Sequence, residues 1–171
     1  MRLAFDTNVV LDVLLDRAPF AESARRLWAA VEAGRVEGVL AAHAFTTVWY
    51  LVAEARTPIS ARGVVALVAG VFGVAAVDQA VVRRALELEF RDFEDAVCAA
   101  AAEAAGCDVV VTRNRKDFGH SPVTAVDPIT ALALLEGGGS PGVSERVSVY
   151  GRRRPKVRGR HRRGGGARAT R

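Results

Sequence analysis

The fold is decided in the first eight residues, MRLAFDTN (1–8), where an apolar run ends abruptly in three polar residues. Residues 3–5 have the composition of a buried strand, yet they lead directly into Asp6, Thr7 and Asn8. Burying an ionised carboxylate is costly unless a positive group meets it. Asp6 therefore either caps the helix that follows or holds a ligand, and the rest of the chain must distinguish these two roles.

Apolar segments that predict strands alternate with amphipathic segments that predict helices along the chain. We expect strands over residues 2–5, 36–42, 72–78, 107–112 and 122–126. We expect helices over residues 8–17, 20–33, 43–55, 59–72, 79–90, 92–106 and 128–135. This alternation is typical of an α/β fold with three layers, α/β/α, around a central parallel sheet of four to five short strands. The strands are almost entirely apolar, as burial on both sides requires.

Charge divides the 171-residue chain into two parts. Residues 1–136 hold 13 Lys and Arg against 18 Asp and Glu, a net charge of −5. Residues 137–171 are rich in Gly and Arg and hold 11 Lys and Arg against one acid, a net charge of +10. We therefore predict one folded domain over 1–136 and a disordered basic tail over 137–171.

The sequence favours a cytoplasmic protein. No apolar run reaches the ~18 residues that a membrane span needs. Asp6, Asp12 and Asp16 come too early for a secretory signal. Without an export signal, Cys98 and Cys107 are expected to be reduced and structural.

The acids that follow the predicted strands are the candidate functional residues, because open parallel sheets bind ligands beyond the carboxyl ends of their strands. They follow four of the strands or open the helix before the fourth: Asp6, Asp78, Asp92, Glu94, Asp95, Asp117 and Asp127. Each has a structural alternative. Asp6 or Asn8 can be a helix N-cap, and Asp92 with Asp95 resembles a capping box. We interpret Asp78 and Asp127 as structural caps.

Asp6, Asp95 and Asp117 are harder to explain as structural residues when taken together. Three carboxylates at one end of a sheet repel each other unless a cation lies among them. Ligands that are all oxygen favour Mg²⁺ or Mn²⁺ over zinc. A metal of this kind suits phosphate chemistry, because it polarises a phosphoryl oxygen and lowers the pKa of bound water.

Three acidic blocks resemble those of the PIN-domain family in order and spacing: LAFDTNVVLDVLLDR (3–17), DFEDAVCAAAA (92–102) and VVVTRNRKDF (109–118). The resemblance covers residues 1 to about 136. It implies a metal-dependent endoribonuclease that hydrolyses RNA phosphodiester bonds, and many members are toxins of bacterial toxin–antitoxin pairs (VapC-like).

The resemblance also implies roles for individual residues. Asp6, Asp95 and Asp117 match the family's catalytic and metal-binding acids. Asp92 lies one turn before Asp95 and can reach the same pocket. Four further residues have expected supporting roles: Asn8, Thr47, Thr112 and Asn114.

One position departs from the family pattern. Most members have a glutamate early in the helix after the second strand, where this chain has Thr46 or Thr47. The missing acid makes a second metal doubtful. It also leaves open an alternative function, a PIN-like RNA-binding or protein-interaction module with weak or no activity.

The expected partners are RNA, a cognate antitoxin protein and a second copy of the chain. Arginines in the tail would add salt-dependent contacts to RNA phosphates. The short apolar helices near the N-terminus would leave an exposed patch that favours self-association or antitoxin binding. His43 opens a predicted helix and is expected to be a capping or surface group.

Overall fold

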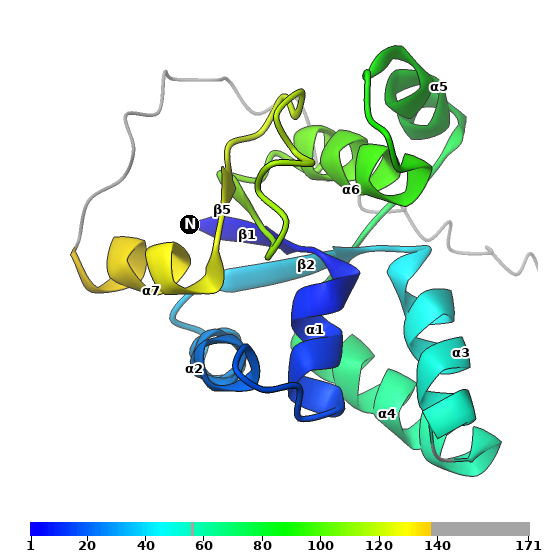
Figure 1. Ribbon diagram of the computed structural model, residues 1–171, viewed down its shortest axis with the longest axis vertical. Coiled ribbons are helices and arrows are strands. Elements are labelled where there is room, and N and C mark those ends of the chain that lie inside the picture. Colours follow the sequence, from blue (N-terminus) through cyan, green and yellow to red (C-terminus); the bar gives the residue numbers. More distant parts are fainter. Residues whose placement is uncertain (56, 138–171) are drawn as a thin grey trace, which may run out of the picture. The chain divides into compact units, whose positions relative to one another are not determined.

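The computed structural model describes residues 1–55 and 57–137, and its core is a parallel sheet (Figure 1). The five strands are β1 (Arg2–Phe5), β2 (Glu37–Ala41), β3 (Gly73–Ala75), β4 (Val109–Val111) and β5 (Ala125–Val126). Their order across the sheet is β3-β2-β1-β4-β5, and every neighbouring pair is parallel. The predicted three-layer architecture is confirmed. With β1 at the centre, the residues after β1 and β4 leave the sheet side by side.

Seven helices connect and cover the strands within the described residues. They are α1 (Thr7–Leu14), α2 (Ala21–Glu32), α3 (Ala44–Ala55), α4 (Pro58–Val71), α5 (Gln79–Glu87), α6 (Phe93–Ala104) and α7 (Pro128–Glu136). Each corresponds to a predicted helix. Several elements are shorter than predicted; β3, for example, is three residues long where seven were expected.

Alternate residues of each strand face opposite layers of the protein, as the two-residue period of a strand requires. Leu3, Phe5 and Val111 belong to a core that includes residues of α1, α2, α3, α4 and α7. Ala4 and Val110 belong to a second core, formed largely with α5 and α6. Figure 1 shows α1, α2 and α4 below the sheet and α5 and α6 above it. Burial on both faces explains why the strands are almost wholly apolar.

Side-chain caps fix where the helices begin, and acids supply most of them. The N-cap residues whose side chains accept a backbone N–H are Asp6, Thr57, Asp78, Asp92 and Asp127. Left-handed glycines follow α2 and α6, with φ of 68° at Gly34 and 65° at Gly106. These caps place the starts of α1, α5, α6 and α7 at set points beside the sheet.

Three further predictions concern the chain as a whole. Cys98 and Cys107 are buried and free in the structure. Among residues 1–55 and 57–137, no helix is long and apolar enough to cross a membrane. The predicted tail lies, after Gly137, outside the described residues.

Candidate functional site

Asp6 caps α1, which is one of the two roles that its sequence position left open. It stands between β1 and α1, and its side chain is 4% exposed. Oδ1 accepts a hydrogen bond of 3.2 Å from the backbone N–H of Asn8 and so caps α1. Oδ2 accepts one of 2.8 Å from the hydroxyl of Thr112. Burial raises the pKa of Asp6, and these two hydrogen bonds oppose the rise.

The segment after β4 is ordered around Thr112, which is fully buried. Its hydroxyl donates to Asp6 and accepts the backbone N–H of Asn114 at 3.0 Å. The backbone N–H of Asp117 donates to the carbonyl of Asn114 at 2.8 Å. Asn8 and Asn114 therefore support the site through their backbone N–H groups. Thr112 contacts Asp6 through its side-chain hydroxyl.

An ion pair holds this same segment against α1. The guanidinium of Arg113 donates to Oδ1 of Asp12 at 3.1 Å, and Asp12 is fully buried. The guanidinium carbon of Arg113 also lies 4.6 Å from the ring centre of Phe20. Oδ2 of Asp12 and Nε of Arg113 are buried with no hydrogen-bond partner among the described residues. This pair fixes the backbone from which Thr112 and Asp117 project.

Asp95 lies near the other acids of the site. It is half-buried in the first turn of α6. Its pKa is raised to about 7 by burial, which is the largest cause, together with the charges of the carboxylates of Asp6, Asp92, Asp117 and Glu94, in that order. The sequence-predicted acids are therefore close enough to repel each other, although they come from the ends of β1 and β4 and the start of α6. Asp92 also caps α6 by accepting the N–H of Glu94 at 2.7 Å.

Glu94 is one of the candidate acids named from the sequence, but it had no predicted role in the site. Its Oε1 accepts hydrogen bonds from the hydroxyls of Thr7 at 3.2 Å and Thr47 at 3.3 Å. Nε2 of His43 lies 3.8 Å from the same oxygen. In sequence, Glu94 looks like an ordinary acid in the first turn of a helix. Only its contacts with Thr7, Thr47 and His43 in the folded chain place it in the site.

His43 also differs from its predicted role as a capping or surface group. Both of its ring nitrogens are buried without a hydrogen-bond partner among the described residues. Burial lowers the pKa of His43, while the charges of Glu94 and Asp6 raise it by less. The imidazole is therefore biased to its neutral form beside the acids, and it does little to balance their charge.

The donor chemistry of these acids fits a hard divalent cation. All the donors are carboxylate or hydroxyl oxygens, the ligands that Mg²⁺ and Mn²⁺ prefer. The repulsion that raises the pKa of Asp95 is what such a cation would relieve. Within residues 1–55 and 57–137, however, no three His, Cys, Asp or Glu side chains are grouped closely enough to hold a metal ion. The acids would have to move closer together to bind one.

Two of the acids that follow strands are structural, as predicted. Asp78 caps α5 by accepting the N–H of Val81 at 3.0 Å. Asp127 caps α7 through the backbone N–H and hydroxyl of Thr130, and these hydrogen bonds lower the pKa of Asp127. Arg115 also lies 3.4 Å from Asp127.

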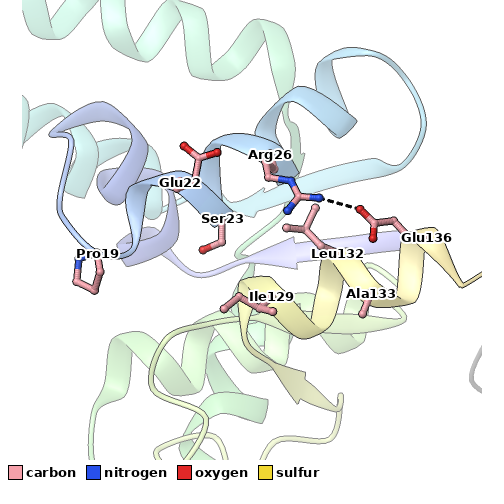
Figure 2. A pocket seen from close by; sticks show the side chains of 8 residues that line it. All are labelled: Pro19, Glu22, Ser23, Arg26, Ile129, Leu132, Ala133 and Glu136. Carbon is pink, nitrogen blue, oxygen red and sulfur yellow. Dashed lines mark hydrogen bonds and ion pairs between the residues drawn. The ribbon is translucent and has the colours of Figure 1, made fainter.

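A cavity of about 410 Å³ lies between α2 and α7, apart from the acids (Figure 2). Its walls include Pro19, Ile129 and Leu132, and Arg26 is paired with Glu136 across it at 2.8 Å. None of the acids around Asp95 lines it. The cavity therefore does not bear on the chemistry of the acidic site.

Comparison with known proteins gives a family and a fold. A sequence model of the PIN domain matches residues 2–116. No curated protein sequence matches the chain.

Several solved structures are similar to the chain. A VapBC complex of Rickettsia felis bound to a promoter DNA fragment has a TM-score of 0.61 at 14% identity, covering 74% of this chain and 98% of its own. A toxin–antitoxin complex from Klebsiella pneumoniae has a TM-score of 0.56 at 22% identity, covering 74% and 97%. A sarcin–ricin-loop-cleaving VapC toxin of Mycobacterium tuberculosis has a TM-score of 0.52 at 20% identity, covering 63% and 86%. At these identities the likeness establishes a shared fold.

Proposed function

Because the chain belongs to the PIN-domain family, we propose that it is an endoribonuclease that depends on Mg²⁺ or Mn²⁺. In this proposal Asp6, Asp95 and Asp117 are the catalytic acids that hold the metal, and Asp92 is a further ligand at its margin. The catalytic domain is residues 1–136. The protein acts in the cytoplasm on RNA.

One observation carries the proposal. Carboxylates from three separate elements lie near the carboxyl edge of the sheet, and burial followed by the charges of these neighbours raises the pKa of Asp95 to about 7. A purely structural role does not account for this arrangement, since each acid would be more stable alone in water. A cation bound among these acids would offset the repulsion between them.

The chain's own residues prepare the site in three ways. Thr112 fixes the orientation of the Asp6 carboxylate and offsets part of the penalty of burying it. The Arg113–Asp12 pair holds the backbone that carries Asp117. Asp92 fixes the start of α6 and thereby the position of Asp95. A divalent ion bound here would supply Lewis-acid stabilisation of the phosphate charge and a water of lowered pKa.

The test is cleavage of labelled RNA by the full chain in Mn²⁺, compared with EDTA. We expect Asp6→Asn to abolish cleavage while leaving the circular dichroism spectrum unchanged. Asp16→Asn is a matched control, because Asp16 is an exposed acid paired only with Arg25 within the described residues. Wild-type cleavage rates in the Asp6→Asn variant, or in EDTA, would contradict the proposal.

We further propose that the protein is the toxin of a toxin–antitoxin pair and binds an antitoxin protein. The support is that several structures of the same fold are toxins in complex with antitoxins. Large apolar side chains are also exposed on α3 and α4, including Tyr50 at 73%, Ile59 at 89% and Leu67 at 52%. A small neighbouring gene whose product co-purifies with the chain and suppresses its RNA cleavage would support the proposal. The absence of any such gene would oppose it.

A second candidate function is an RNA-binding or protein-interaction module without turnover. It is favoured by the threonine at position 47, where most of the family has an acid, and by the absence of three closely grouped ligands in the described residues. Calorimetric titration with Mn²⁺ separates the two functions. Saturable binding is expected of the nuclease, whereas no binding up to millimolar metal would favour the inactive module.

A further inference from the structure

We infer that two exposed aromatic rings, those of Phe93 on α6 and Tyr50 on α3, stack against bases of the RNA substrate beside the acidic site. The inference rests on the proposed function, because it takes RNA as the ligand, and it extends that function to the way in which the strand is held. Phe93 and Tyr50 bind bases that flank the cleaved bond, and the acids act on the phosphate.

The first support is that these two rings are exposed and have no aromatic or cationic partner. Within the part of the chain that the structure describes, the exposed aromatic side chains are Phe20, Tyr50 at 73% and Phe93 at 50%. The ring of Phe20 already covers the guanidinium of Arg113. Phe93 and Tyr50 have no such contact among the described residues, so a face of each ring is available to a ligand.

The second support is that the two rings come from helices that meet at the site. The hydroxyl of Thr47 donates to Oε1 of Glu94 at 3.3 Å and so joins α3 to the first turn of α6. Tyr50 follows Thr47 by three positions, and it therefore lies one turn further along the same face of α3. Phe93 directly precedes Glu94. One contact between two helices thus brings both rings to the same part of the protein.

The same contact connects the rings to the proposed catalytic acids. Thr7 directly follows Asp6 and donates to Oε1 of Glu94 at 3.2 Å. Asp95 directly follows Glu94 in α6. Because residues two apart project from different faces of a helix, Phe93 does not point with Asp95. A base stacked on Phe93 therefore belongs to a nucleotide beside the one whose phosphate meets the acids.

The surroundings of Phe93 favour a base over an apolar protein surface as the occupant. Asp92 and Glu94, on either side of it in the chain, are exposed acids. A protein that covered the ring would also remove these carboxylates from water, which is costly. A stacked base covers only the face of the ring. Stacking on aromatic side chains is a common way for proteins to hold unpaired bases.

The loop after β4 supplies positive charge for the backbone of the strand. Arg113, Arg115 and Lys116 lie within four residues of one another, although residues 1–136 have a net charge of −5. Lys116 is exposed and forms no ion pair with any described residue. Proteins that bind single strands combine a basic surface, which follows the phosphates, with rings on which bases stack.

The test measures how the full chain binds one labelled RNA sequence, as a single strand and as a duplex, in EDTA. The forms compared are wild type, Phe93→Leu, Tyr50→Leu, Phe93→Trp and Leu86→Ala. Leucine keeps an apolar side chain but removes the ring. Leu86→Ala is the matched control, because Leu86 is exposed on α5 and has no part in the site. Thermal unfolding checks that each form is folded.

We expect each leucine variant to bind the single strand about 5-fold or more weakly than wild type, the effect of losing one stacked base. Duplex binding should be unchanged, because paired bases are already stacked on one another. Leu86→Ala should bind as wild type. Phe93→Trp should bind the single strand at least as tightly as wild type, and the single strand should quench its fluorescence more than that of wild type. A purely structural role for the rings does not predict a difference between single strand and duplex.

The inference is overturned if both leucine variants bind the single strand as wild type, or if they lose single strand and duplex equally. Cleavage by the wild type in Mn²⁺ would then leave the nuclease function standing without it. If the leucine variants lose only the single strand but the wild type does not cleave RNA in Mn²⁺, the nuclease function fails and the stacking role holds. If a leucine variant does not fold, Phe93→Trp decides, and no additional quenching by the single strand overturns the inference.

Discussion

Replacing Asp95 with asparagine should stabilise the metal-free protein at alkaline pH, even though it removes a residue proposed to be essential. The carboxyl pKa of Asp95 is raised from 3.8 to about 7 by burial and by neighbouring acids. Each unit of pKa corresponds to ~1.4 kcal/mol, so the shift sets a ceiling of ~4 kcal/mol. Water screens a half-buried group, and we expect about 1–3 kcal/mol.

The sign of the effect follows from proton linkage. The folded chain holds the Asp95 proton more tightly than the unfolded chain does. Folding stability is therefore fully retained below the unfolded pKa near 3.8 and declines as pH rises toward about 7. The raised pKa values of Asp6 and Asp12 act in the same direction. Asparagine cannot ionise, so Asp95→Asn removes the Asp95 part of this decline.

The assay is thermal unfolding of the full chain in EDTA at pH 4.5 and pH 8, followed by circular dichroism. We expect the variant to melt about 3–10 °C above wild type at pH 8 and close to it at pH 4.5. Adding Mn²⁺ at pH 8 should stabilise the wild type more than the variant. A variant less stable than wild type at pH 8, or a difference that does not change with pH, would refute the account of crowded carboxylates.

Three other changes test the supports of the site and the tail. Thr112→Val removes the buried hydroxyl that donates to the Asp6 carboxylate. It should lower the free energy of unfolding in urea by about 1–3 kcal/mol and raise the pKa of Asp6 further. An unchanged Asp6 pKa by NMR would contradict this role of Thr112. Arg113→Met should lower the free energy of unfolding by about 3–5 kcal/mol, because it leaves Asp12 buried and unpaired. Adding Asp12→Asn should restore part of that stability. No restoration would contradict a stabilising role for the Arg113–Asp12 pair. Truncation after residue 136 should leave cleavage intact but weaken RNA binding and flatten its dependence on salt, whereas identical salt slopes would exclude a role for the tail in RNA binding.

The fold could be predicted from the sequence because local signals agree with the global arrangement. Apolar strands alternate with amphipathic helices, and acids or glycines mark most helix ends. Asp78 and Asp127 were correctly interpreted as caps for the same reason, since a cap depends on residues only two or three positions away. Strand lengths were overestimated because hydrophobicity extends beyond the paired residues, as at Phe72, which precedes β3 and whose N–H still bonds to the carbonyl of Val68 in α4.

The site was only partly predictable, because its contacts join residues far apart in the chain. The motif acids were found from their positions beside strands. Glu94 was named among the candidate acids but given no role, because an acid in the first turn of a helix has a sufficient local explanation. Its partners Thr7 and Thr47 lie 87 and 47 positions away. The backbone roles of Asn8 and Asn114 could not be read from the sequence, where their side chains are the candidate groups.

The most direct test of the central claim is to locate Mn²⁺ in crystals of the full chain by its anomalous scattering. We predict a peak at the carboxyl edge of the sheet, within coordination distance of carboxylate oxygens of Asp6 and Asp95, with Asp117 drawn toward it. Crystals soaked in millimolar Mn²⁺ that show no peak there, or a peak only at other surface acids, would contradict the claim that these carboxylates are gathered to hold a metal.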